Sequence, residues 1–141
     1  MKNPGKSLRK LYAAALANLT YDGKSVTVYD ALPIETTPDR YVYINAMTYA
    51  QVGNNNAFIF DGAVTLDIVV KQYKKIDYDT VDGIGQEVLN TLLPYPYSQQ
   101  EDTDFQFLNP TVSSVNYLVE PDGSYFILRK IIILSQSIIQ K

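Results

Sequence analysis

The chain has 141 residues and a net charge of −3 at pH 7, and it contains neither cysteine nor histidine. Hydrophobic residues make up 46% of it and charged residues 19%, which is typical of one globular domain spanning residues 1–141. The missing side chains exclude disulfides, Ser-His-Asp and Cys-His catalytic groups and ordinary zinc sites. We therefore expect no enzyme and no cofactor, with chemistry based on carboxylates alone as the one enzymatic alternative.

The negative charge also gives the protein no overall attraction for nucleic acid. No apolar run, including residues 131–134, approaches the ~20 residues of a membrane span, so we expect no membrane partner. Basic residues at the N-terminus are not followed by the apolar core of a signal peptide, and we expect no secretion.

Two segments carry the apolar spacing of an amphipathic helix. The offsets i, i+3, i+4, i+7, i+8 and i+11 are filled from Leu8 to Leu19, and the same six offsets recur from Val81 to Leu92. Each segment is followed by a residue or turn that ends a helix: Asp22-Gly23 follows the first and Pro94 the second. For the second helix we expect Asp77 or Asp79 as the N-cap.

Alternating apolar and polar residues predict the strands. They cover residues 25–29, 40–46, 64–71, 112–120 and 124–135. Pro121-Asp122-Gly123 joins the last two strands as a hairpin. Gly53 and the three asparagines after it are expected to form the turn of another hairpin within residues 49–61. The sequence therefore predicts an α+β fold: a mostly antiparallel four- to five-stranded sheet with two amphipathic helices packed on one face.

Two apolar groups look like parts of a subunit interface. Ile131, Ile132, Ile133 and Leu134 are apolar on both faces of one strand, which fits either a strand between two layers or a strand covered by a partner. Phe58, Ile59 and Phe60 follow a polar tip that cannot pack a core, so we expect this segment to become ordered on assembly. Twelve tyrosines, against five phenylalanines and no tryptophan, suit either an interface or a half-buried sheet surface.

Charged clusters form the second set of interface candidates. Lys6, Arg9 and Lys10 lie with Lys2 at the start of the first helix, where the helix dipole disfavours positive charge. Glu101, Asp102 and Asp104 lie on an acidic loop within residues 94–104, which we expect to be irregular. We expect the two clusters to meet across a subunit contact, with a solvated surface as the alternative for each.

Neither acidic group of the chain has the pattern of a metal site. A calcium loop that began at Asp77 would need glycine at its sixth position and glutamate at its twelfth, where Asp82 and Val88 stand. Helix capping explains these acidic residues better. The sequence therefore predicts no catalytic, cofactor-binding or metal-binding residues.

In its order of elements the chain resembles the tail terminator (tail completion) proteins of long-tailed phages. The resemblance rests on the first amphipathic helix, Asp22-Gly23-Lys24, Val26-Thr27-Val28-Tyr29 leading into Leu32-Pro33, Tyr41-Val42-Tyr43-Ile44, the strand 64–71 and the helix 79–93. Thr27 stands where that family commonly has proline, and the C-terminal hairpin is longer.

The resemblance implies a virion protein that forms a ring at the head-proximal end of the tail. Such a ring is expected to be a hexamer, with a dodecamer as the alternative. It ends tail-tube polymerisation and joins tail-tube proteins to the head connector or portal. DNA passes through its channel without specific binding. The subunit would be in the host cytoplasm during assembly and in the virion afterwards. The alternatives are a neck or ring adaptor between portal and tail of a short-tailed phage, and a ligand- or peptide-binding α+β module.

Overall fold

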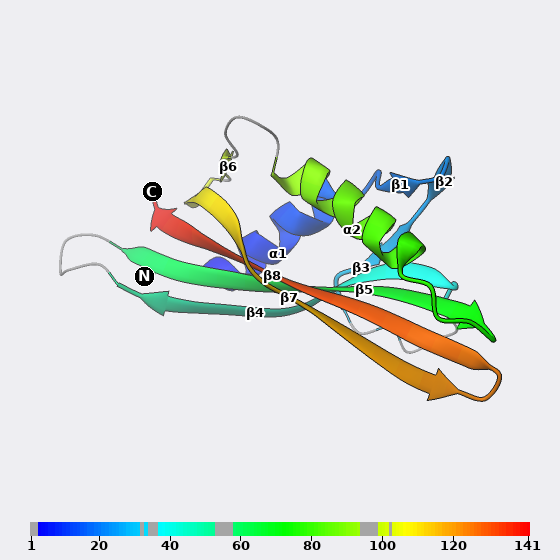
Figure 1. Cartoon of the computed structure of the whole chain (residues 1–141). Helices are drawn as coiled ribbons and strands as arrows, with labels where there is room; N and C mark the ends of the chain where they lie inside the picture. The colour runs from blue at the N-terminus through cyan, green and yellow to red at the C-terminus, as the bar shows by residue number, and fades with distance from the viewer. Residues whose placement is uncertain (1–2, 32, 34–36, 53–57, 94–98, 102) are drawn as a thin grey trace.

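The computed structural model describes residues 3–31, 33, 37–52, 58–93, 99–101 and 103–141. Both helices lie on one face of a long, twisted sheet (Figure 1). The elements are α1 (Pro4–Ala15), β1 (Thr20–Tyr21), β2 (Lys24–Ser25), β3 (Thr27–Tyr29), β4 (Arg40–Gln51), β5 (Ile59–Tyr73), α2 (Asp79–Leu92), β6 (Gln99–Glu101), β7 (Phe105–Asp122) and β8 (Tyr125–Gln140).

The main sheet has the order β3-β4-β5-β8-β7-β6, and every pair in it is antiparallel except β3 with β4. The predicted fold class is therefore confirmed, with six strands instead of four or five. The additional strand is β6, which pairs with residues 106–108 of β7. Its residues were expected in an irregular loop, because three polar residues in a row give no alternation to read.

The first helix starts on a side-chain cap. The Asn3 carboxamide oxygen accepts the N–H of Gly5 at 2.8 Å, and a proline fills the first turn, where no intrahelical N–H is lost. The predicted apolar stripe extends beyond the end of the helix. Leu16 and Leu19 lie in the turns after Ala15 and are still buried in the core.

The predicted strand 25–29 is wrong in one respect, since the chain leaves one sheet and joins another within it. Asp22 and Gly23, with φ of 54° and 73°, make the tight turn of the β1–β2 hairpin. Val26 then donates its N–H to the carbonyl of Leu19 at 2.9 Å and buries its side chain, before β3 pairs in parallel with β4.

The second helix begins at Asp79 as expected, but Tyr78 occupies its N-cap position. The Asp77 carboxylate accepts the N–H of Asp79 at 3.0 Å and so bonds the free helix end from outside it. The carboxamide of the buried Gln72 holds Asp77 in turn, with two hydrogen bonds of 2.9 Å to its backbone. Further along α2, Gly83 lies so close to Tyr21 that a Cβ would come within 2.3 Å of the ring.

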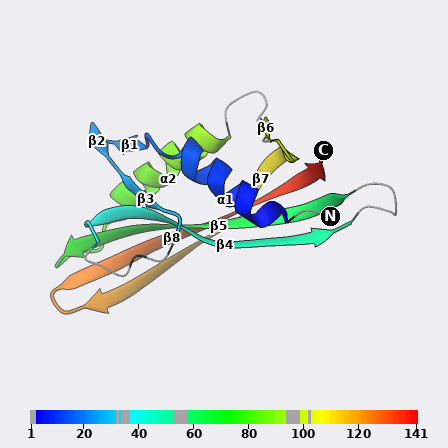
Figure 2. The same ribbon diagram turned by 180° about the vertical axis from the view of Figure 1, so that it is seen from behind.

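The strands are longer than the helices that cover them. The hairpin of β4 and β5 extends past α1 at one end of the sheet, and the hairpin of β7 and β8 extends past α2 at the other (Figures 1 and 2). The core lies between these two projecting hairpin ends, where both helices face the middle of the sheet. Its largest fully buried side chains are Phe60, Phe105, Leu8, Leu16, Ile44, Leu66, Ile68, Ile84, Leu92, Leu128, Ile132 and Leu134.

Candidate assembly interface

One face of the sheet carries neither of the two described helices, and we call it the open face (Figure 2). Cross-strand partners share a face, so the ladders assign its residues strand by strand. Its central members are Tyr29, Tyr41, Tyr43, Thr65, Asp67, Val69, Ile127, Arg129, Ile131 and Ile133. Aromatic, aliphatic and charged side chains thus share a surface that α1 and α2 do not cover.

The apolar run of β8 divides between the two faces. Ile132 and Leu134 point to the helices and are fully buried. Ile131 and Ile133 lie on the open face and are half-buried. Of these four candidates, only Ile131 and Ile133 could therefore contact another chain, whereas Ile132 and Leu134 belong to the core of the domain.

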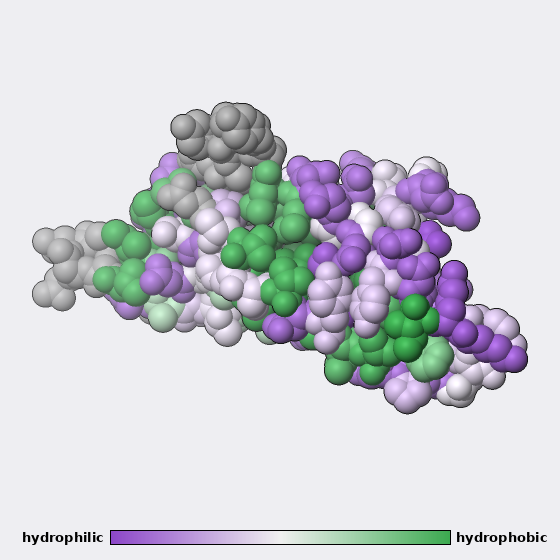
Figure 3. Space-filling view, viewed as in Figure 1, coloured by the Kyte–Doolittle hydropathy of each residue, from purple (hydrophilic) through white to green (hydrophobic). Residues whose placement is uncertain are grey.

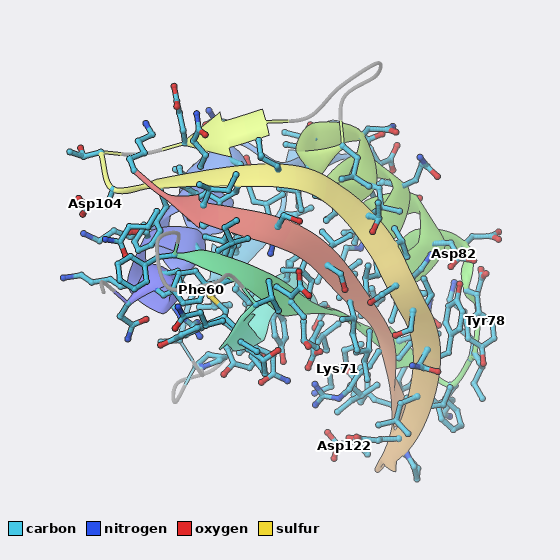
Figure 4. All side chains as sticks on the ribbon, turned by 90° about the vertical axis from the view of Figure 1, so that its left-hand side faces the viewer. Phe60, Lys71, Tyr78, Asp82, Asp104 and Asp122 are labelled. Carbon is cyan, nitrogen blue, oxygen red and sulfur yellow. The ribbon has the colours of Figure 1, made fainter. Side chains whose placement is uncertain are left out.

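The segment that follows the hairpin tip divides in the same way. Phe60 is buried and makes an edge-to-face contact with Tyr49, with ring centroids 5.8 Å apart. Ile59 is half-buried on the open face, and Phe58 is exposed. Figure 4 shows Phe60 next to α1. The polar tip itself, residues 53–57, lies outside the described residues.

The basic cluster does not act as one unit. Lys6 and Lys10 are exposed. Arg9 turns to its own subunit, where its guanidinium donates to the carbonyls of Asp30 and Ile44, the latter at 2.9 Å. Arg9 therefore ties α1 to the end of β3 and the middle of β4, a role that sequence spacing could not show.

The acidic cluster has intrasubunit partners as well. The Lys141 ammonium lies 2.9 Å from a Glu101 carboxylate oxygen, and this bond, with a weaker one from Gln106, lowers the pKa of Glu101. The Asp104 carbonyl accepts the N–H of Lys141, and Asp102 lies outside the described residues. The structure thus brings Glu101 and Asp104 to Lys141 of the same chain.

A third polar cluster was not singled out by sequence. Asp82 of α2 accepts hydrogen bonds from the Tyr117 hydroxyl at 2.6 Å and the Lys130 ammonium at 3.0 Å. The bond from Tyr117, followed by that from Lys130, lowers the pKa of Asp82. Tyr78 stacks edge-to-face on Tyr117 with ring centroids 5.4 Å apart. These contacts fasten α2 to the β7–β8 hairpin, and Figure 4 shows Tyr78 and Asp82 beside it.

Asp67 is the buried charge of the open face. Its side chain is 6% exposed, Asn45 donates to its Oδ2 at 3.1 Å, and its Oδ1 receives no hydrogen bond from the described residues. It borders a hollow of about 540 Å³ lined by Pro33, Thr37, Tyr41, Tyr43, Asn45, Asp67 and Arg129. Burial raises the pKa of Asp67, against the opposing effects of the Asn45 bond and the Arg129 charge.

Replacing Asp67 with asparagine should stabilise the subunit at neutral pH by about 1 kcal/mol, because a charge with an unpaired oxygen leaves the sheet. A raised pKa means that folding takes up a proton at Asp67, so the wild type loses stability as pH rises through the window above the ordinary aspartate value. The gain from Asp67→Asn should therefore shrink on acidification. Thermal unfolding of both proteins between about pH 4 and pH 8 measures this. A variant that is less stable at neutral pH, or a pH-independent difference, would contradict it.

A second hollow lies over the other half of the open face. It measures about 500 Å³ and is lined mainly by small side chains of four strands: Thr48, Tyr49, Ala50, Asp61, Gly62, Ala63, Thr111, Ser135, Gln136 and Ser137. In the part of the chain that the structure describes, no three acidic side chains are placed to hold a metal ion. None of the described helices is long and apolar enough to cross a membrane.

No protein-family model and no curated protein matches the chain. Its structure is similar to that of a chain in the solved "Virion of native gene transfer agent (GTA) particle", with a TM-score of 0.60. The two chains share 10% sequence identity, and the similarity covers 93% of this chain and 85% of the other. The likeness establishes a fold shared almost from end to end with a chain of a virion particle.

Proposed function

We propose that the protein is a structural subunit of a phage-type virion, which forms a ring at the head-proximal end of the tail, ends tail-tube polymerisation and joins the tail to the head connector. The observation that carries this proposal is the nearly full-length fold similarity to a chain of a virion particle. The order of sequence motifs, which resembles tail terminator proteins, supports the finer assignment.

The surface of the subunit suits assembly. The open face bears half-buried Ile131 and Ile133 beside its tyrosines, and the outer part of the β7–β8 hairpin exposes further apolar side chains, visible among polar ones in Figure 3. Apolar patches of this kind, bordered by polar residues, are typical of protein–protein contacts. A neck or ring adaptor of a short-tailed phage would use the same surfaces, and the two roles differ in the partner that the ring binds.

The expected result is a ring. Light scattering of the purified protein over a concentration series should show oligomers that grow with concentration, and negative-stain micrographs should show closed rings, hexameric by preference. If rings form only on tail tubes, the protein should bind one end of tubes purified from a phage mutant that lacks this subunit. A monomer at every concentration that leaves tubes unbound would overturn the proposal, and saturable binding of a small ligand or peptide by that monomer would favour a binding module.

A further inference from the structure

Over most of its length the outer edge of β7 pairs with no described strand. β8 lies on one side of β7, while β6 covers only residues 106–108 on the other. From Ser114 to Asp122 the pairing with β8 runs without a register shift, and no described strand lies on the outer side. An edge strand directs half of its backbone N–H and C=O groups outward, so this stretch presents a row of groups ready for another strand.

From Ser114 to Val119 this edge carries neither the charges nor the prolines that natural proteins use to block such pairing, and Glu120, Pro121 and Asp122 follow only at the hairpin end. Edge strands are normally kept short or given lysines, prolines or inward-pointing charges. Residues 114–119 contain no charged residue and no proline. They also belong to a strand with four exposed apolar side chains: Val112, Val115, Tyr117 and Leu118. An unprotected edge of this length is a surface for strand addition.

The opposite edge of the same sheet is open as well. β3 pairs with β4 only at residues 41–43, so residues 46–51 have β5 on one side and no described strand on the other. This stretch, Ala-Met-Thr-Tyr-Ala-Gln, is again free of charge and proline. The view along the sheet in Figure 4 places β7 on one outer side and β4 on the other. Each subunit thus carries two different unprotected edges of similar length.

We propose that the β7 edge of one copy pairs with the β4 edge of the next, so that one sheet continues from subunit to subunit. This inference rests on the proposed ring. Contact between two different surfaces is head-to-tail and can close into a ring, whereas pairing of two identical edges would stop at a dimer.

The topology also sets the direction of the pairing. Within one subunit β4 runs parallel to β8 and antiparallel to β7. Rotation about a ring axis that lies roughly along the strands keeps the direction of β4, so the neighbour's β4 meets β7 antiparallel. Antiparallel pairing is the more stable arrangement per residue.

Engineered disulfides test the contact directly, since the natural chain has no cysteine. Thr48 and Ala50 on β4 and Ser114 and Asn116 on β7 all lie on the open face. Within one chain the two strands are three strand spacings apart, about 14 Å, and a disulfide needs Cα atoms within about 7 Å. A disulfide between them must therefore join two copies.

The experiment combines Thr48→Cys or Ala50→Cys with Ser114→Cys or Asn116→Cys, four double variants that sample several registers. Mild oxidation should give at least one of them a ladder of covalent multimers on a denaturing gel. The four single variants and the pair Thr48→Cys with Ile76→Cys, an exposed site on neither β4 nor β7, should give no ladder.

The outcomes separate this inference from the proposed function. Multimers in solution without a ladder from any double variant would overturn the edge pairing and leave the ring intact. Dimers from Ser114→Cys or Asn116→Cys alone would show that two β7 edges pair, and would overturn it too. A strictly monomeric protein that also leaves tail tubes unbound would overturn both.

A charge variant gives a second readout. Val115→Lys with Leu118→Lys should weaken self-association at least tenfold while leaving the thermal unfolding of the subunit nearly unchanged, since both side chains are already exposed. Ile76→Lys is the matched control and should assemble normally. Normal assembly of the double lysine variant would contradict the edge pairing.

Discussion

Ile132→Ala should lower the free energy of unfolding by about 2–5 kcal/mol, whereas Ile133→Ala should lower it by about 1 kcal/mol or less. The two residues are adjacent on β8, but Ile132 is fully buried beneath the helices and Ile133 is half-buried on the open face. Truncating Ile132 leaves a cavity in the core, while solvent reaches the space that Ile133 vacates. Chemical denaturation of the two variants measures the difference.

Aspartate at the same positions extends the comparison to assembly. Ile132→Asp should fail to fold, because it buries an unpaired charge. Ile133→Asp should fold, and it should assemble poorly if the open face meets a neighbouring subunit. Full assembly of Ile133→Asp would show that this part of the open face stays free in the proposed ring. Equal effects of the two alanine variants would contradict the assignment of faces.

Tyr12→Phe should destabilise the subunit by about 1–3 kcal/mol, although it removes a single oxygen atom. The buried Tyr12 hydroxyl donates to Gln136 Oε1 at 2.6 Å, and burial raises the pKa of Tyr12, so the hydroxyl keeps its proton. Gln136 Nε2 already lacks a partner among the described residues. The variant would therefore leave the whole carboxamide buried without a hydrogen bond.

The double variant Tyr12→Phe with Gln136→Leu is the matched control. It removes both polar partners at nearly constant volume, so it should recover most of the stability that either single variant loses. A double-mutant cycle by chemical denaturation gives the coupling between the two side chains. Losses that simply add would show that the hydrogen bond contributes nothing beyond packing.

The sequence predicted the architecture well because each helix and most strands bury one face and expose the other. This leaves a helical stripe or a strand alternation of apolar residues in the sequence. The sequence predicted β4, β5, β7 and β8 too short, and in β4 and β7 irregular pairing contributes to the error. The register shift between Ile44 and Ala46 stops the alternation of β4, and the shift between Leu108 and Thr111 hides the start of β7. A bulge adds a residue to one strand and reverses the faces that a period of two assigns.

The candidate interface was harder to predict because long side chains reach partners that are remote in sequence. Arg9 carries the same charge as its lysine neighbours, yet it donates a hydrogen bond to the carbonyl of Ile44, 35 residues away. Asp67 looked like an ordinary polar position on a half-buried strand, and only its neighbours Asn45 and Arg129 reveal the buried carboxylate. The choice between Ile132 and Ile133 likewise depended on which face the helices cover.

The ladder between β5 and β8 has a mechanical consequence. It runs from Ile59 opposite Ile139 to Tyr73 opposite Tyr125 without a register shift, and it joins the two hairpins that extend from opposite ends of the sheet. Its hydrogen bonds lie across the strands, so a pull along the strands strains all of them together. A force that separated the strands sideways would break the same bonds one after another. The protein should therefore resist stretching between its two hairpins far better than it resists the sideways separation of β5 from β8.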